Sequence, residues 1–255
     1  MTQWTVDTIR TLMNQWYPPS TAQGWDKVGL ITGAPQAPVH KVLVALDPTQ
    51  AVIDEACQWG ADMVITHHPL LLRGASFLSE ESAKGRAIAA LNRSRIALFN
   101  AHTNGDVAID GVAQACADAI GLKETEVFAP EGTNDRGQTI GLGRIGTISP
   151  MSLRQFARLV AKALPAGPTG LLVGGDLEAT VHRVAVSPGA GDSLLDQVLA
   201  SGVDVLITAD LRHHPASEFL EEGHCGLICA SHWATETLWM PVLARKLREE
   251  ARRSA

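Results

Sequence analysis

The fold class can be predicted from two segments, Lys41–Pro48 (KVLVALDP) and Ala61–Pro69 (ADMVITHHP). Each contains a continuous apolar run rich in β-branched residues, which is typical of a strand buried on both faces of a sheet. Residues 50–60, which lie between the two runs, are expected to form a helix. A strand, a helix and a second strand in this order predict a βαβ unit with parallel pairing. We therefore expect an α/β architecture.

This alternation continues along the chain. Val6, Ile9, Met13 and Trp16 fall on one face at helical spacing, so residues 4–17 read as an amphipathic helix that ends at Pro18-Pro19. Further elements are expected as a strand at 28–31, a helix at 82–93, a strand at 96–100 and a helix at 111–120.

The second half of the chain repeats the first. Arg183–Pro188 resembles Val42–Pro48, and residues 203–208 resemble residues 61–66. A third strand follows in each copy and ends in a histidine both times. We expect two similar α/β domains from an internal duplication, although two hydrophobic strand–helix–strand units can also resemble each other by chance.

The repeat sets the expected domain limits. We expect residues 1–125 to form the first domain and residues 126–224 the second. The C-terminal segment, about 225–255, is expected to pack back near the metal site of the first domain.

Composition excludes several classes of protein. The net charge of −6 does not favour nucleic acid or an anionic membrane surface as a partner. With 45% hydrophobic residues and no run of 18 apolar residues, the chain is neither disordered nor membrane-spanning. Residues 1–17 lack the pattern of a signal peptide, and four cysteines are too few for a disulfide framework. A cytoplasmic location is expected.

Two adjacent histidines, His67 and His68, follow the second buried strand. Ligands in α/β folds bind beyond the carboxyl ends of parallel strands. Consecutive strand residues point to opposite faces, so this pair does not easily hold one ion. The pair can contact two neighbouring ions if the chain turns at Pro69. Histidines that are only packed or solvated at a strand end would give the same pattern.

Two further strand ends carry metal-binding side chains. His102 and Asp106 follow the strand at 96–100, where the ordinary alternative is an Asn-Gly-Asp turn. His232 and Glu236 follow the last strand at i, i+4 spacing, where the alternative is an ordinary first helical turn. Together the three strand ends supply imidazoles and carboxylates for two divalent metal ions, with Zn, Fe or Mn as candidates.

Four motifs resemble those of the Nif-three-like dinuclear metal-centre family, whose members are also known as homologues of the type 2 form of GTP cyclohydrolase I. They are Trp25–Leu30, Thr66–Pro69, Ala101–Asp106 and Ser231–Glu236. The resemblance implies a two-domain α/β protein that assembles as a toroidal homohexamer, with two metals between the domains.

The resemblance also implies roles for individual residues. The family's metal ligands fall on His67, His68, Asp106, His232 and Glu236, with a carboxylate bridging the ions, and His102 matches a histidine that lines the site. The chain departs from the family pattern at three positions, which are Gly105, Trp233 and Ala209.

The expected function is that of a metal-dependent hydrolase. Metal-activated water would attack a small-molecule substrate, with a nucleotide or a phosphoester as candidates, and His102 would be the catalytic residue that moves protons. The alternative is a non-catalytic metal-binding or regulatory oligomer. Nothing in the sequence indicates a membrane partner or direct nucleic-acid binding.

Two other segments, a glycine-rich motif and an Arg-His-His sequence, resemble ligand-binding sequences. Gly141–Gly146 matches G-x-G-x-x-G, but no helix opens directly from it, so we interpret it as a glycine-rich strand. Arg212, His213 and His214 follow the repeat of the first histidine-bearing strand and are expected to face the metal site, where they could contact substrate.

Overall fold

The computed structural model describes residues 3–254, which divide into two compact units. Unit 1 contains the residues up to Gly105 together with those from Met240 onward, and unit 2 is Asp106–Trp239. The α/β class predicted from the sequence is confirmed, because each unit has its own sheet with helices packed against it. No helix among the described residues has the length and apolar character needed to cross a membrane.

Unit 1 is built on a four-stranded sheet in the order β1-β4-β3-β2. Its strands are β1 (Gly29–Thr32), β2 (Val42–Ala45), β3 (Met63–Thr66) and β4 (Ala97–Asn100). The strands β2, β3 and β4 are parallel, as predicted, whereas β1 runs antiparallel to β4.

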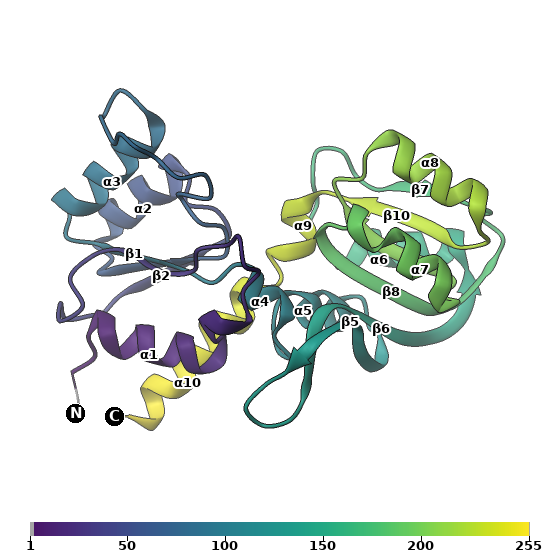
Figure 1. Ribbon diagram of the computed structural model, residues 1–255, viewed down its shortest axis with the longest axis horizontal. Helices are drawn as coiled ribbons and strands as arrows, with labels where there is room; N and C mark the ends of the chain where they lie inside the picture. The colour runs from purple at the N-terminus through teal and green to yellow at the C-terminus, as the bar shows by residue number, and fades with distance from the viewer. Residues whose placement is uncertain (1–2, 255) are drawn as a thin grey trace. The chain divides into compact units, whose positions relative to one another are not determined.

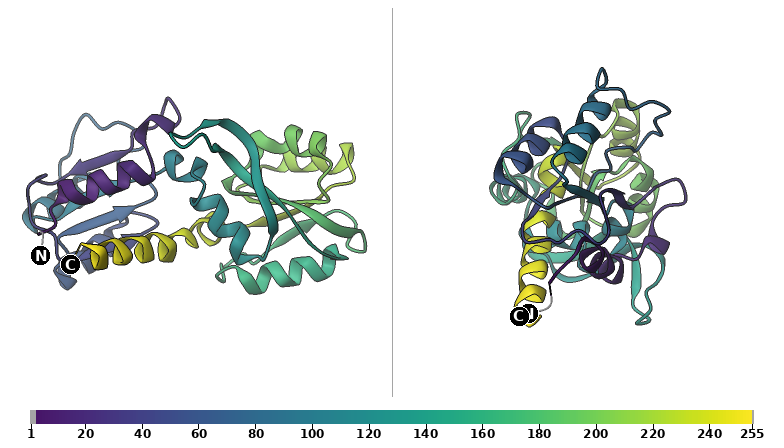
Figure 2. Two further views of the ribbon diagram at one scale, coloured as in Figure 1. Left: turned by 90° about the horizontal axis from the view of Figure 1, so that it is seen from below. Right: turned by 90° about the vertical axis from the view of Figure 1, so that its left-hand side faces the viewer.

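Helices cover both faces of this sheet (Figures 1 and 2). On one face lie α2 (Gln50–Trp59) and α3 (Ala83–Arg93), and on the other α1 (Val6–Trp16) and α10 (Trp239–Arg253). A short 3-10 turn, η1 (Pro19–Thr21), follows α1. The amphipathic pattern is observed in α1, where Val6, Ile9 and Met13 are buried.

The strand at 41–46 differs from the expectation. All four residues of β2 are partly exposed, although a strand buried on both faces was predicted. The reason is its place in the sheet, since β2 pairs only with β3 and so forms an edge. A groove of about 750 Å³ runs beside this edge and is lined by Val42, Val44, Trp59 and Leu247 among others.

Unit 2 is built on a six-stranded mixed sheet in the order β5-β6-β8-β9-β10-β7. Its strands are β5 (Lys123–Thr133), β6 (Thr139–Ser152), β7 (Leu172–Gly174), β8 (Thr180–Ala190), β9 (Val205–Ala209) and β10 (Gly226–Ala230). Only β8, β9 and β10 are parallel to one another. The Gly141–Gly146 segment lies inside β6, which agrees with its interpretation as a glycine-rich strand.

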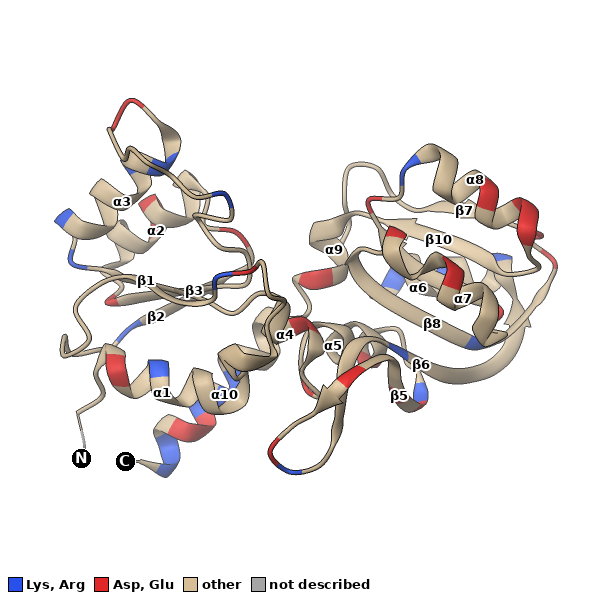
Figure 3. Cartoon of the chain, in the orientation of Figure 1, with Lys and Arg blue, Asp and Glu red and all other residues tan. Residues whose placement is uncertain are grey.

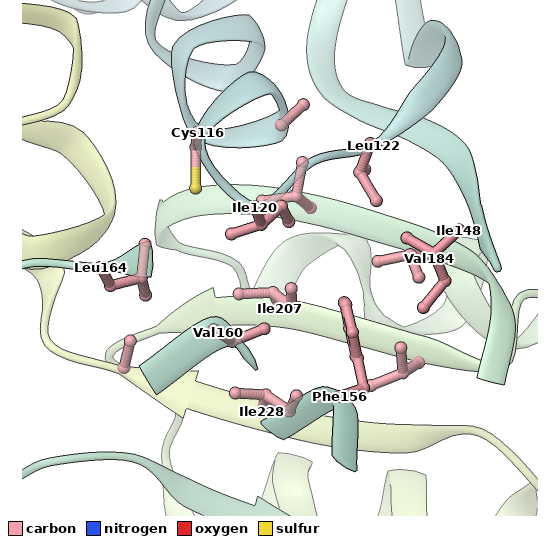
Figure 4. Packing of buried hydrophobic residues seen from close by; sticks show 14 of the residues in the cluster. Cys116, Ile120, Leu122, Ile148, Phe156, Val160, Leu164, Val184, Ile207 and Ile228 are labelled. Carbon is pink, nitrogen blue, oxygen red and sulfur yellow. The ribbon is translucent and has the colours of Figure 1, made fainter. Parts of the chain in front are cut away.

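The central strands of unit 2 are buried on both faces. One side of the sheet packs against α5 (Val112–Ala119), α6 (Leu153–Ala163) and α9 (His232–Glu236), and the other against α7 (Leu195–Ser201) and α8 (His213–Glu222), with η2 (Asp192–Leu194) before α7. Side chains alternate between the two cores, so that Ile207 faces α6 and Leu206 faces α7. Figure 4 shows Phe156 and Val160 of α6 against Ile207 and Ile228 of the sheet.

The division into units differs from the domain limits expected from the repeat. Residues 106–125 and 225–239 belong to unit 2. The packing explains this, because Cys116 and Ile120 lie in the same buried cluster as Val184 of β8.

The two sheets share a strand arrangement. In unit 1 the parallel strands β2, β3 and β4 follow one another, and antiparallel β1 lies beside β4. In unit 2 the parallel strands β8, β9 and β10 follow one another, and antiparallel β7 lies beside β10. This is the arrangement that an internal duplication predicts, and the common origin of the two halves stays a hypothesis.

Charge is distributed unevenly over the helices (Figure 3). Helix α8 carries Glu218, Glu221 and Glu222 and contains no Lys or Arg. In α10, by contrast, basic residues form ion pairs with neighbouring acids, such as Arg253 with Glu250 at 3.3 Å. The cations at the end of α10 also complement the helix dipole.

Candidate metal centre

Three histidines of unit 1 come together at the carboxyl ends of β3 and β4. The parallel register pairs Thr66 with Asn100, the last residues of these strands, so the segments that follow lie side by side. His67 and His68 follow β3, and His102 follows β4. One ring nitrogen from each of the three lies within 4.8 Å of the others. Strand pairing therefore assembles three imidazoles from two distant parts of the sequence.

The adjacent histidines do not point apart as they would in a continuing strand. Their ring centroids are 4.8 Å apart, because β3 ends at Thr66 and the chain turns. The hydroxyl of Thr66 donates a hydrogen bond to the carbonyl oxygen of His68 at 2.8 Å and stabilises this turn. The chain thus turns here, which is the condition under which the two histidines can contact neighbouring ions.

Every one of these imidazoles is oriented by an acceptor at Nδ1. The Nδ1 atom of His67 lies 2.9 Å from the carbonyl oxygen of Ala101, and that of His68 lies 2.7 Å from Asp47 Oδ1. His102 Nδ1 lies 3.0 Å from Asp26 Oδ2. Carbonyl and carboxylate oxygens only accept, so each Nδ1 carries the hydrogen, and in a neutral ring Nε2 carries the lone pair. Metal-binding histidines typically donate the hydrogen of one ring nitrogen to such an acceptor and bind the metal through the other.

Burial favours the neutral form of His102. Removal from solvent, followed by the nearby ring of His67, lowers the pKa of His102 below its usual value. The pKa of Asp26 is also set by opposing effects. Its burial raises its pKa, but hydrogen bonds from Thr103 and the nearby His102 outweigh this and lower the pKa of Asp26 overall. Unit 1 therefore holds a neutral imidazole beside an ionised carboxylate.

Unit 2 brings together the other predicted ligands. Ser231 caps α9 by accepting a hydrogen bond from Ala234 N at 3.2 Å, so His232 and Glu236 lie one helical turn apart. His232 Nε2 is 3.0 Å from Glu236 Oε2, and His232 Nδ1 is 2.7 Å from Asp210 Oδ2. A carboxylate oxygen of Asp106 lies within 4.8 Å of one of Glu236.

The charges in unit 2 fit a bound cation. Glu236 is 4% exposed, and two carboxylates at this separation repel each other when little water screens them. The hydrogen bond to Glu236 is the largest cause that raises the pKa of His232, to about 9. A divalent cation that replaces the shared proton between His232 and Glu236 would be bound by both groups, since metal ligands must be deprotonated. Imidazole nitrogens with carboxylate oxygens suit Zn, Fe or Mn.

Gly189 leaves room for the Glu236 carboxylate. It adopts φ +70, and a Cβ added there would lie 2.4 Å from Glu236 Oε1. Its N–H donates to Thr235 Oγ1 at 3.0 Å, which ties the end of β8 to α9. The close approach of this backbone to the carboxylate requires glycine.

A buried arginine, Arg144, supports the segment that follows Asp106. It is 2% exposed, and its Nη2 donates to the carbonyl oxygens of Ala108 at 2.5 Å and Ile109 at 3.2 Å. Burial lowers the pKa of Arg144 to about 10, so it stays charged at neutral pH. Nothing in the local sequence pattern of β6 indicated this role, because it depends on a partner more than 30 residues away.

The three carboxylates that orient histidines were not predicted as site residues. Asp47 follows β2 and Asp210 follows β9, in each case at the end of a strand that neighbours a histidine-bearing strand. An acid directly after such a strand is a signal that could have identified both. Asp26 lies in a loop and could be found only through its motif.

The segment Arg212–His214 does not join the ligands of unit 2. Arg212 pairs with Asp192, its Nε lying 2.5 Å from Oδ2, and occupies the N-cap position of α8. His213 and His214 are exposed and contact each other, with ring centroids 5.2 Å apart. The expectation that these residues face the metal site stays a prediction.

The chain is similar to known proteins over nearly its whole length. The family Duf34/NIF3 (NGG1p interacting factor 3) matches residues 4–255. A "GTP cyclohydrolase 1 type 2 homolog" of Streptomyces coelicolor is 44% identical over 242 residues, which cover 94% of this chain and 85% of that protein. The protein of the same name from Mycobacterium tuberculosis is 32% identical over 341 residues, covering 93% of this chain and 89% of the relative.

Solved structures show the same fold. The Bacillus cereus protein related to NIF3 superposes with a TM-score of 0.92 at 26% identity, covering 100% of this chain and 95% of the other. The Staphylococcus aureus protein SA1388 superposes with a TM-score of 0.84 at 28% identity, covering 92% and 88%. The resemblance seen in the motifs is confirmed, and the chain belongs to the Duf34/NIF3 family.

Proposed function

We propose that the protein is a hydrolase that depends on two divalent metal ions. The residues that would hold the ions are His67, His68, Asp106, His232 and Glu236. The observation that carries this proposal is the acceptor at Nδ1 of each ligand histidine, because it presents Nε2 for coordination.

When bound, such a pair of cations supplies Lewis-acid activation of water and of a substrate oxygen. The protein contributes the rest. The fixed rings of His67 and His68 avoid reorganisation on binding, and the buried carboxylate of Glu236 supplies compensating negative charge. His102, a neutral imidazole in the same cluster as His67 and His68, accepts and returns the proton of the attacking water.

The proposed substrate is a small molecule with a nucleotide-like or phosphoester group. The names of the Streptomyces and Mycobacterium relatives support a nucleotide. We further propose that the protein acts in the cytoplasm as a homohexamer. Its four cysteines are free thiols, as a reducing compartment requires.

The test combines metal analysis with a substrate screen. We expect two Zn, Fe or Mn ions per chain in the wild type, and hydrolysis of at least one nucleotide or phosphodiester. His67→Ala should lose at least one ion and lower kcat by 100-fold or more, on the order of the effect of removing a catalytic group. The control is His40→Ala, which removes an exposed histidine of the same unit and should keep both ions.

The outcomes separate the proposal from its alternative. Turnover that does not differ between the wild type and His67→Ala would contradict a role for the metal site in hydrolysis. Two tightly bound ions without any turnover would instead favour a non-catalytic metal-binding or regulatory protein.

A further inference from the structure

The buried carboxylate of Asp26 forms hydrogen bonds with His102 and its neighbour Thr103. The side chain of Asp26 is 0% exposed. Its Oδ2 atom accepts three hydrogen bonds, from His102 Nδ1 at 3.0 Å, Thr103 N at 3.1 Å and Thr103 Oγ1 at 2.7 Å. All three donors come from two consecutive residues, His102 and Thr103, of which Thr103 begins α4 (Thr103–Val107).

The loop that carries Asp26 is fixed to the same two residues. Gln23 N donates to Thr103 Oγ1 at 2.9 Å, and Asp26 N donates to the carbonyl oxygen of Gln23 at 2.8 Å. The hydroxyl of Thr103 therefore accepts from the loop backbone and donates to the carboxylate. This arrangement leaves Asp26 little freedom to move away from His102.

Asp26 differs from the other two carboxylates that orient histidines. Asp47 and Asp210 are 43% and 55% exposed, so water can share their charge. Asp26 has no such access, and its Oδ1 atom is buried without a hydrogen bond from the described residues. Burying an ionised group with one oxygen unsatisfied is unfavourable for stability, and such arrangements occur mainly at functional sites.

The ring of His102 lies among the other histidines of unit 1. Its centroid is 5.2 Å from that of His67 and 5.5 Å from that of His68. With Nδ1 directed at Asp26, Nε2 is the atom of His102 through which it can exchange a proton. The indole of Trp25, which is 62% exposed, lies with its centroid 6.0 Å from that of the His102 ring. The ring therefore has a fixed end at Asp26 and a chemically available end at Nε2.

We propose that Asp26 is a positioning residue, which fixes His102 in the tautomer with hydrogen on Nδ1 and keeps Nε2 as a proton acceptor beside His67 and His68. The inference rests on the proposed function only for the use of that proton in hydrolysis. In Asp–His pairs of this kind, the carboxylate sets the tautomer and orientation of the ring without itself taking the proton.

The test is the protonation pattern of His102 in the full chain. We would record solid-state ¹⁵N spectra of protein labelled at histidine and loaded with Zn²⁺, and assign His102 by comparison with His102→Gln. In the wild type we expect hydrogen on Nδ1 and none on Nε2. In Asp26→Ala we expect both tautomers, because the acceptor is gone.

Asp26→Asn serves as the conservative variant. Its carbonyl oxygen can take the place of Oδ2 and accept the same three hydrogen bonds, so the wild-type tautomer should return. Asp47→Asn is the matched control, because Asp47 contacts His68 and its replacement should leave the His102 signals unchanged.

Three results would overturn the proposal, and none of them requires catalytic turnover. They are hydrogen on Nε2 of wild-type His102, an unchanged single tautomer in Asp26→Ala, and a metal-coordinated Nε2. If Asp26→Ala fails to fold, the wild-type spectrum still decides between the tautomers.

Activity gives a second readout. With bis(4-nitrophenyl) phosphate as the probe, Asp26→Ala should lower kcat by about 100-fold at unchanged KM and unchanged metal content. The expected tautomer in the wild type and both tautomers in Asp26→Ala, without turnover in either, would contradict the hydrolase and leave the positioning role established.

Discussion

Gly189 leaves the space that the carboxylate of Glu236 occupies. A methyl group at this position would overlap the carboxylate and would also force an L-residue into a left-handed conformation. We expect Gly189→Ala to weaken metal binding by about 10- to 100-fold, the range found when the support of a ligand is disturbed. Isothermal titration with Zn²⁺ would measure the change.

The matched control is Gly202→Ala. Gly202 has nearly the same φ of +66, but a Cβ there would meet no atom within 4 Å. This variant shares the backbone strain of about 1 kcal/mol and lacks the overlap with Glu236. If both variants lost metal to the same extent, backbone strain alone would explain the effect and the role of Gly189 would be refuted.

Strand ends explain why the predicted histidines of unit 1 could be found from sequence. His67, His68 and His102 directly follow apolar runs, and parallel pairing brings such ends together. Asp26 could not be found from spacing, because it reaches His102 from 76 positions away and such a pairing depends on tertiary structure. Asp47 and Asp210, by contrast, follow strands that neighbour histidine-bearing strands.

Among the helices and strands, an apolar run predicts a strand but does not predict where that strand lies in its sheet. Apolar runs identified β2, β3 and β4, but the pattern of β2 does not show whether a second partner strand exists. In the structure β2 lies at the edge of the sheet, and a groove lies beside it. The long antiparallel strands β5 and β6 are likewise defined by pairing with each other.

Helix α10 closes unit 1 although it lies at the far end of the chain. Leu243 and Leu247 are buried, and Lys246 contacts the rings of Trp16 and Tyr17. Burial of each leucine contributes about 1.5–3 kcal/mol. Deletion of residues 240–255 should therefore destabilise unit 1 by several kcal/mol, a large share of the stability of a domain.

Hydrogen exchange measured by mass spectrometry would test this prediction. We expect β2, β3 and β4 to lose protection in the truncated chain, while β8, β9 and β10 keep theirs. Deletion of residues 252–255 is the control, because Arg252 and Arg253 are exposed. Equal loss of protection in both sheets would show that α10 is not specific to unit 1.

At the scale of the whole molecule, the surface leaves large apolar side chains in solvent. Phe77 is 87% exposed and Leu172 is 66% exposed, and the groove beside β2 adds further apolar area. Only 19% of the residues are charged, below the roughly 25% of ordinary domains. A contiguous apolar surface is typical of a face that is covered in an assembly, and the groove beside β2 is the candidate for such a face.

Sedimentation velocity would test the proposed homohexamer. The expected mass is six times 27.1 kDa. Because apolar contacts are little screened by salt, the assembly should persist at 0.5 M NaCl. A species of 27.1 kDa at micromolar concentration would contradict the assembly and leave the low charge content unexplained.

The return of α10 to unit 1 also bears on how the protein is made. Domains generally fold as units while the chain is being synthesised. Unit 2 ends at Trp239, so all of it has been translated before α10 is complete, whereas unit 1 must wait for its final helix. A chain that stops before α10 is therefore expected to leave unit 1 without the helix that buries Leu243 and Leu247, and to be more sensitive to proteases than a chain that contains it.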